Sequence, residues 1–80
     1  MYEVIGIQFN RGVSKKTGKP YNFLTVHCKV NRPQGELEGI CTAKFDFNLE
    51  YYPNLVIPSV GDNVEVSFNY KGYCNNIFIL

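Results

Sequence analysis

Apolar and polar residues alternate along most of this 80-residue chain, and a period of two is the pattern of β-strands. The clearest example is the segment 20–30, "PYNFLTVHCKV". Its even positions are apolar, namely Leu24, Val26, Cys28 and Val30. Its odd positions are aromatic, polar or basic, namely Tyr21, Phe23, Thr25, His27 and Lys29. Because successive side chains of a strand point to opposite faces, we expect the even set to face the core and the odd set to face away from it.

The same period predicts strands in four other segments, which are 2–9, 39–47, 63–70 and 77–80. The first of these places three apolar residues on one parity, Ile5, Ile7 and Phe9. Gly12 and Gly18 bracket polar residues, and this arrangement predicts a hairpin turn within 10–19.

Residues 48–60, "NLEYYPNLVIPSV", have no regular period, and Pro53 and Pro58 exclude a long helix there. Five short strands without an amphipathic helix predict an all-β fold. Residues 1–80 are too few for two cores, so we expect a single domain. A five-stranded, OB-fold-like small barrel is the economical arrangement, because closing a sheet removes exposed strand edges. An SH3-like barrel is the structural alternative.

The three cysteines, Cys28, Cys41 and Cys74, form an odd set without a C-x-x-C pair. The segment "MYEVIGIQFN" contains Glu3 and no basic cluster, so it is typical of a strand rather than of a signal peptide. Both features favour reduced thiols and a cytoplasmic location. No apolar run approaches the roughly 20 residues of a membrane span, so we expect no membrane partner.

The net charge of +1 conceals an uneven distribution of charged residues. Residues 1–35 carry six cations and one acid, whereas residues 36–80 carry two cations and six acids. The densest group lies within nine residues that contain no acid, namely Arg11, Lys15, Lys16 and Lys19. A near-neutral chain with one basic part predicts one charged surface rather than a generally adhesive protein.

The basic stretch is not a phosphate loop. Its glycines, Gly12 and Gly18, are separated by five residues instead of four, and a proline follows Lys19 where a Ser or Thr is required. Two interpretations remain. The stretch is either a solvated hairpin tip that protects a strand edge, or an electrostatic clamp on a polyanion.

Two aromatic residues, Tyr21 and Phe23, follow the basic tip on the outward parity of the strand, and His27 and Lys29 extend that face. Rings beside cations suit single-stranded nucleic acid, because a base stacks on a ring with about 1–3 kcal/mol while cations track the phosphates. Duplex DNA does not need the rings, since its bases are already stacked. The alternative is a second small cluster in which residues 48–60 or a partner subunit cover both rings.

The segment "NYKGYCNN" repeats this pattern more weakly, with Tyr70, Lys71 and Tyr73 around a glycine. Beside the first hairpin it would add a ring and a cation, and otherwise it is an ordinary tight turn. For Tyr51 and Tyr52, which precede a proline, we expect packing in the core or in an interface.

Catalysis and metal binding find little support in the sequence. The only histidine, His27, lies on the parity opposite to Cys28, whereas a Cys/His nucleophilic pair needs both on one side. The cysteines and the histidine lack the close spacing of zinc ligands, and the acids are scattered. We expect a binding protein without catalytic residues, metal or cofactor, in which Cys28 and Cys41 are small core residues.

The stretch "RGVSKKTGKPYNF" followed by "HCKV" resembles the gene V protein family, the single-stranded DNA-binding, helix-destabilising proteins of filamentous phages. That family shows a Gly-Val-Ser segment, a basic tip and a Gly-Lys-Pro-Tyr segment that leads into a strand with a cysteine. A weaker similarity runs through "VEVSFNYKGYCNNIFI", where the family also has a lysine, a glycine and an exposed aromatic residue in a hairpin. The resemblance covers residues 10–30 well and the middle of the chain poorly.

The resemblance implies an OB-type fold, a symmetric homodimer and cooperative, largely sequence-independent coating of single-stranded DNA during replication and packaging. The residues that match the family's DNA-binding positions are basic or aromatic, namely Arg11, Lys15 or Lys16, Lys19, Tyr21, Phe23 and Tyr73. Relative to the family, Thr17 is an insertion in the tip, and Lys29 stands where the family has tyrosine.

The sequence therefore predicts a single-stranded DNA-binding protein that acts as a homodimer. Its candidate site combines cations and rings of two hairpins, namely Arg11, Lys15, Lys16, Lys19, Tyr21, Phe23, His27, Lys29, Tyr70, Lys71 and Tyr73. The apolar segment 77–80 is a candidate dimer seam. The alternatives are a protein-interaction module on a small barrel and an RNA-binding translational regulator that uses the same face.

Overall fold

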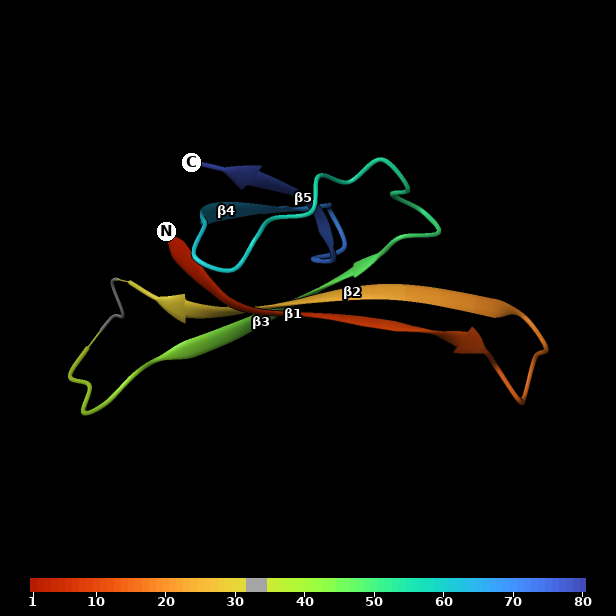
Figure 1. Cartoon of the computed structure of the whole chain (residues 1–80), viewed down its shortest axis with the longest axis horizontal. Helices are drawn as coiled ribbons and strands as arrows, with labels where there is room; N and C mark the ends of the chain where they lie inside the picture. The colour runs from red at the N-terminus through yellow and green to blue at the C-terminus, as the bar shows by residue number, and fades with distance from the viewer. Residues whose placement is uncertain (32–34) are drawn as a thin grey trace.

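The computed structural model describes residues 1–31 and 35–80, and the regular structure of these residues is one antiparallel β-sheet (Figure 1). Its strands are β1 (Tyr2–Val13), β2 (Pro20–Val30), β3 (Thr42–Asn48), β4 (Asn63–Phe68) and β5 (Cys74–Ile79). Their order across the sheet is β3-β2-β1-β4-β5. The predicted all-β class is confirmed. No helix in the described part of the chain is long and apolar enough to cross a membrane.

The sheet is open, and the expected barrel is not closed. Strands β3 and β5 are the two edges, and no hydrogen-bonded ladder joins them in the described residues. The two edges still approach each other at one point, because Asp46 of β3 and Cys74 of β5 line the same groove. Five-stranded barrels of the OB type are often partly open.

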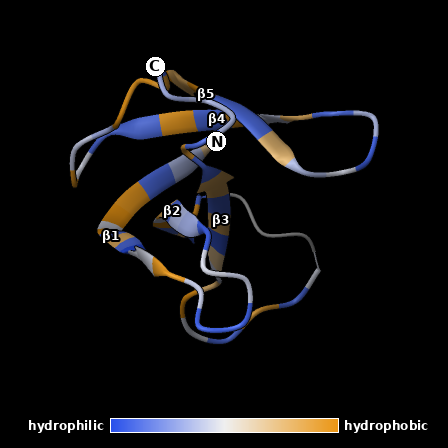
Figure 2. Ribbon diagram, turned by 90° about the vertical axis from the view of Figure 1, so that its right-hand side faces the viewer, coloured by the Kyte–Doolittle hydropathy of each residue, from blue (hydrophilic) through white to orange (hydrophobic). Residues whose placement is uncertain are grey.

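The core lies on one face of the sheet. Apolar and polar residues alternate along the strands (Figure 2). The buried side chains of the core are Val4, Leu24, Val26, Cys28, Phe45, Phe47, Val64 and Ile77. The even parity of segment 20–30 thus supplies core residues as predicted, although Val30 is half-buried. Cys28 is buried, whereas Cys41 is half-buried.

A β-bulge in β1 changes which residues of that strand face the core. The register of β1 against β2 shifts between Val4 and Gly6, so Val4 is fully buried and Ile5 is exposed. Ile7 returns to the core-facing side and packs against the buried cluster. The expected common face for Ile5, Ile7 and Phe9 is therefore wrong at Ile5, because a bulge leaves one extra residue out of the pairing.

The hairpin of β1 and β2 extends beyond the core as an arm (Figure 1). We call residues 9–23 the hairpin arm. β1 continues to Val13 instead of ending at residue 9, and its last pair joins Val13 to Pro20. The radius of gyration is 14.1 Å, whereas a compact domain of this length has about 12 Å. The molecule is accordingly elongated, with principal extents of 45 × 26 × 24 Å.

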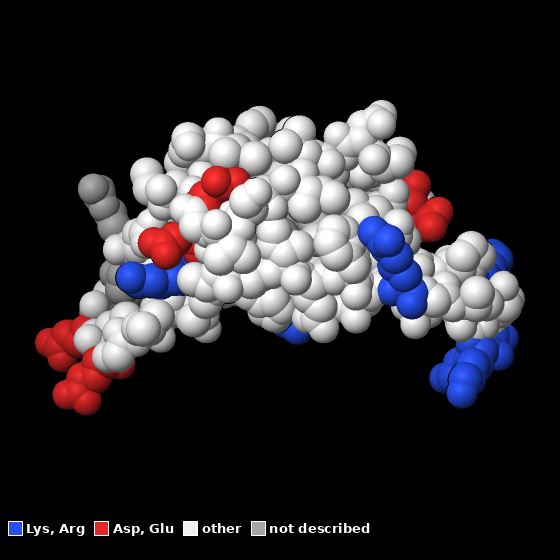
Figure 3. All heavy atoms as spheres, in the orientation of Figure 1, with Lys and Arg blue, Asp and Glu red and all other residues white. Residues whose placement is uncertain are grey.

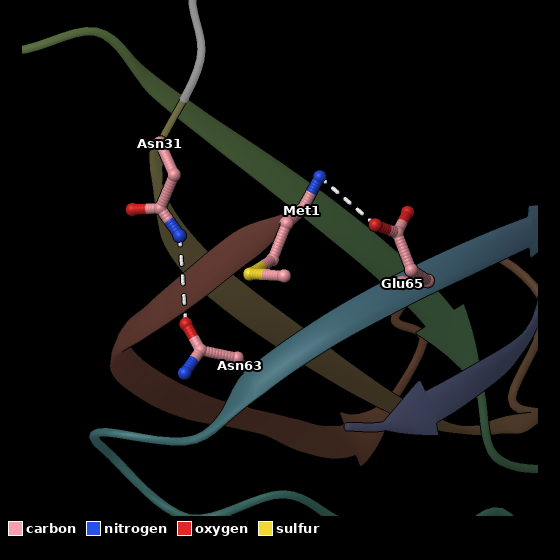
Figure 4. Close-up of polar contacts among 4 residues, drawn as sticks. All are labelled: Met1, Asn31, Asn63 and Glu65. Atoms are coloured by element: carbon pink, nitrogen blue, oxygen red, sulfur yellow. Dashed lines mark hydrogen bonds and ion pairs between the residues drawn. The ribbon is translucent and has the colours of Figure 1, made fainter.

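Polar contacts hold the start of β1 and the end of β2 beside β4 (Figure 4). The amino group of Met1 lies 2.9 Å from Oε1 of Glu65, and Nδ2 of Asn31 donates to Oδ1 of Asn63 at 3.4 Å. An exposed ion pair of this kind stabilises a fold by about 0–1 kcal/mol. These contacts lie at the ends of β1 and β2 opposite the arm, and they join those ends to β4.

Candidate nucleic-acid interface

The tip of the hairpin arm is a turn formed by residues 14–19. The amide of Gly18 donates to the carbonyl of Ser14, and the amide of Ser14 donates to the carbonyl of Lys19. Gly18 has a φ of 69°, a left-handed conformation that glycine adopts without steric cost. Thr17 belongs to this turn, because its hydroxyl accepts a hydrogen bond from the amide of Lys19 at 3.3 Å.

The cations of the tip are exposed. Lys15, Lys16 and Lys19 are all solvent-exposed. Lysine and arginine side chains gather at the end of the molecule where Figure 1 shows the tip (Figure 3). Several acidic side chains lie toward the opposite end, although one acidic group lies on the same side as the tip. The basic part of the sequence thus becomes a basic end of the molecule.

The ring of Tyr21 lies against a glycine of the neighbouring strand β1. The register pairs Tyr21 with Gly12, and both belong to the face opposite the core. A Cβ atom at Gly12 would lie 2.6 Å from Oη of Tyr21 and 2.9 Å from its Cζ, which is closer than atoms can pack. The ring therefore occupies the space that a side chain at position 12 would need, and it remains 41% exposed.

Phe23 follows on the same face and lines an open groove. Its exposed fraction is 37%, so both outward rings of β2 are solvent-accessible as predicted. The groove has a volume of about 690 Å³. Its walls come from the arm, from the end of β3 and the turn after it, and from the β4–β5 hairpin: Phe23, Asp46, Asn48, Tyr51, Tyr52, Asn69, Lys71, Tyr73 and Cys74.

The β4–β5 turn is held by Asn69. Its side-chain oxygen accepts hydrogen bonds from the amides of Lys71 and Tyr73 at 2.9 and 3.0 Å. This turn presents Tyr73, which is 68% exposed, and Lys71 to the groove. Tyr70 is 92% exposed and does not line the groove, although Nζ of Lys71 lies 5.6 Å from the centre of its ring. The β4–β5 hairpin thus lies beside the β1–β2 hairpin, which was one of the two alternatives that the sequence left open.

Tyr51 and Tyr52 are groove residues that sequence reasoning missed. Tyr51 is 77% exposed, so it does not pack in the core, one of the two roles expected for it, and Tyr52 is half-buried. Asn48 causes the turn that places them, because its carbonyl accepts hydrogen bonds from both amides. The available signal was the Asn-x-x-Tyr-Tyr-Pro segment, in which an Asn and a Pro bracket a turn.

Arg11 is not brought together with the two rings. It pairs with Asn22 in the register, which places its side chain on the face opposite Tyr21 and Phe23. There its Nε donates to Oδ1 of Asn22 at 3.1 Å, and its Cζ lies 4.6 Å from the centre of the Phe9 ring. Arg11 therefore contributes charge to the arm from the other side.

His27 and Lys29 share the outward face of β2 but lie away from the tip. His27 is half-buried, with Nε2 3.1 Å from Oε1 of Gln8, and Lys29 is exposed. Neither residue lines the groove. The predicted site is thus divided into a basic tip, a ring-lined groove and a distal polar region.

The outward face also contains a buried polar residue, Thr25, which is only 5% exposed. Its hydroxyl donates to Oδ1 of Asp46 on β3 at 2.6 Å, and this bond satisfies the buried hydroxyl. Thr25 was expected among the outward residues, and it has that parity, but its neighbours exclude water from it. Asp46 itself is exposed in the groove.

The cysteines are free. Burial raises the pKa of the thiols of Cys28 and Cys74, and the negative charge of Asp46 contributes to the shift at Cys74. A raised pKa favours the neutral thiol, which is a weaker nucleophile than the thiolate.

No protein family, curated protein or solved structure matches this chain. The resemblance to the gene V family accordingly stays a prediction that rests on the quoted residues. The geometry offers a cationic tip for phosphates and a groove with four aromatic residues for flat, unpaired groups.

Proposed function

We propose that this protein binds single-stranded DNA largely without sequence specificity, and that it coats such DNA in the cytoplasm during replication or packaging of a phage or mobile element. The observation that carries the proposal is the groove, in which Phe23 of one hairpin meets Tyr73 and Lys71 of the other. The basic tip extends from the same arm that carries Phe23. The likeness to the gene V family supports the same function.

The chemistry of the groove suits unpaired bases better than paired ones. Every base has a π-face, and stacking on an aromatic side chain contributes about 1–3 kcal/mol per base. Lys71 lines the groove and the lysines of the tip are exposed on the arm that carries Phe23, and these cations would neutralise phosphates of a bound strand. A duplex hides the faces of its bases, so it would use the cations alone.

A homodimer is part of this proposal. Large apolar side chains of the last two strands and of the preceding connection are exposed, namely Val56, Ile57, Val60, Phe68, Phe78, Ile79 and Leu80. A second copy that covered them would remove apolar surface from water and would add core to a small domain. Light scattering at micromolar concentration tests this point, and a monomer would contradict it.

The function is tested by fluorescence anisotropy with labelled oligo-dT and with a duplex of the same length, each at two salt concentrations. If four to six phosphates are contacted per protomer, log K falls against log salt with a slope of about −3 to −4, from roughly −0.7 per contact. Preference for the duplex would refute the stacking argument. A matching oligo-U tests the RNA alternative.

A protein-interaction module is the second candidate, and the exposed apolar residues of β4 and β5 favour it. Such a module would bind oligo-dT weakly, and its binding would not follow the salt dependence of a polyanion. A variant that lacks Lys15, Lys16 and Lys19 separates the two functions. Unchanged oligo-dT binding by this variant would exclude the clamp.

A further inference from the structure

One carboxylate in the groove is held in place by a buried partner. Asp46 and Thr25 are opposite each other in the register of β2 and β3, and Oγ1 of Thr25 donates to Oδ1 of Asp46 at 2.6 Å. Thr25 is buried, so its hydroxyl has a fixed environment. In the described part of the chain Asp46 forms no ion pair. Its exposed carboxylate therefore keeps free acceptor positions in a groove whose other walls are aromatic rings, the amides of Asn48 and Asn69, Lys71 and Cys74.

An ionised carboxylate accepts hydrogen bonds and donates none. It therefore favours a base whose edge presents a donor over a base whose edge presents an acceptor. Cytosine presents an exocyclic amino group, N4, which donates to Asp or Glu side chains. Thymine presents a carbonyl oxygen, O4, at the same position. An oxygen that faces a carboxylate is repelled, because both groups carry negative charge density. Adenine also carries an amino group on its edge, so it belongs to the same class as cytosine.

We propose that Asp46 makes the groove select bases whose edge carries an amino group where thymine carries O4, namely cytosine and adenine, over thymine. This inference rests on the proposed function and adds a preference to otherwise sequence-tolerant binding. Phe23 and Tyr73 line the groove together with Asp46, so a base that stacks on either ring lies close to an acceptor. The selected ligand is single-stranded nucleic acid rich in cytosine or adenine.

The sharpest comparison is between short oligo-dC and oligo-dT of equal length. Both bases are pyrimidines, so ring size and the number of phosphates are matched. The group at position 4 differs, because it is a donor in cytosine and an acceptor in thymine. Binding is measured by anisotropy at one salt concentration and at mildly alkaline pH, where cytosine is unprotonated. Wild-type protein is expected to bind oligo-dC about fivefold or more tightly than oligo-dT, from the discrimination that one good contact to a base edge provides. Equal affinities would overturn the inference.

Asp46→Asn tests whether the carboxylate is the cause. An amide keeps an oxygen that accepts from Thr25, so the substitution preserves the internal hydrogen bond, and circular dichroism verifies the fold. It also supplies a donor for O4 of thymine, so the ratio of the two affinities is expected to fall to one or to reverse. The matched control is Glu50→Gln, which removes one negative charge directly after β3 at an exposed residue outside the groove.

The control separates charge from recognition. Glu50→Gln is expected to tighten both oligonucleotides equally and to leave their ratio unchanged. If Asp46→Asn also changes both affinities by one factor, the carboxylate acts only as a repulsive charge and the inference is wrong. If neither oligonucleotide binds the wild-type protein, the proposed function itself fails, and this outcome is distinct from equal binding of both.

Discussion

The contact between Tyr21 and Gly12 makes one substitution especially informative. A Cβ at position 12 would lie 2.6 Å from Oη, 2.9 Å from Cζ and 3.3 Å from Cε1 of Tyr21. Ordinary van der Waals contacts of a Cβ atom are 3.4–4 Å. Gly12→Ala must therefore displace the ring by about 1 Å or more, because packed atoms do not overlap.

The fold is expected to tolerate this displacement. Tyr21 is exposed at the arm, so the ring has room to swing outward. Gly12 does not have a positive φ, so alanine introduces no backbone strain. Glycine in a strand is itself less stable than alanine by roughly 0.5–1 kcal/mol. We therefore expect the free energy of unfolding to change by no more than about 1 kcal/mol.

Binding is expected to change more than stability. If Tyr21 stacks on a base, Tyr21→Ala weakens oligo-dT binding by about 1–3 kcal/mol. Gly12→Ala moves the ring without removing it, so it should cost a part of that energy, on the order of 1 kcal/mol or a fivefold rise in Kd. The salt slope should stay the same, because no cation is changed.

The assay is anisotropy with oligo-dT on a double-mutant cycle, together with NMR of the Tyr21 ring. In the Tyr21→Ala background, Gly12→Ala should have no effect on affinity. Gly6→Ala is the matched control, since its Cβ would make only an ordinary contact, 3.6 Å from Cβ of His27. Wild-type affinity with a shifted ring, or an equal loss in both backgrounds, would refute the positioning role of Gly12.

Three further predictions concern the tip, the groove and the core. Lys19→Ala should flatten the salt slope of oligo-dT binding by about 0.7, because one phosphate contact is lost, and an unchanged slope would remove Lys19 from the clamp. Tyr73→Ala, which removes a groove ring, should weaken oligo-dT binding by about 1–3 kcal/mol, whereas Tyr70→Ala, outside the groove, should have little effect. Equal losses in the two titrations would show that the groove is not the stacking site. Leu24→Ala removes a fully buried side chain and should lower the free energy of unfolding in urea by about 2–5 kcal/mol, and a loss below 1 kcal/mol would contradict its core position.

Local patterns in the sequence predicted the strands well where one face is buried. β2 spans Pro20–Val30, the same residues as the predicted segment, because its alternation is regular and a proline is its first residue. β5 was expected at residue 77 and begins at Cys74. Asn75 and Asn76 are turn-forming residues, but Oγ of Ser67 donates to Oδ1 of Asn75 at 2.6 Å and extends the pairing. Such a contact joins residues of two strands, so it cannot be predicted from the pattern of either strand by itself.

The groove could not be predicted from periodicity. Phe23 and Tyr73 belong to separate hairpins, and their proximity follows from the sheet order and from the approach of β3 to β5. The bulge at Ile5 was missed for a related reason, because an extra residue in a strand changes the facing of side chains without changing the composition. Parity did place Tyr21 and Phe23 outward, since it depends only on the buried side of one strand.

The hairpin arm has a consequence for how this protein can evolve. The side chains that hold the sheet together and the lysines of the arm's tip are separate sets, since none of the tip residues 14–19 belongs to the buried cluster. Exchanges of charge, insertions or deletions there leave the folding equilibrium nearly untouched. Under the proposed function, affinity for nucleic acid could thus change between lineages while the scaffold stays constant, and the tip is the natural place to graft a new specificity.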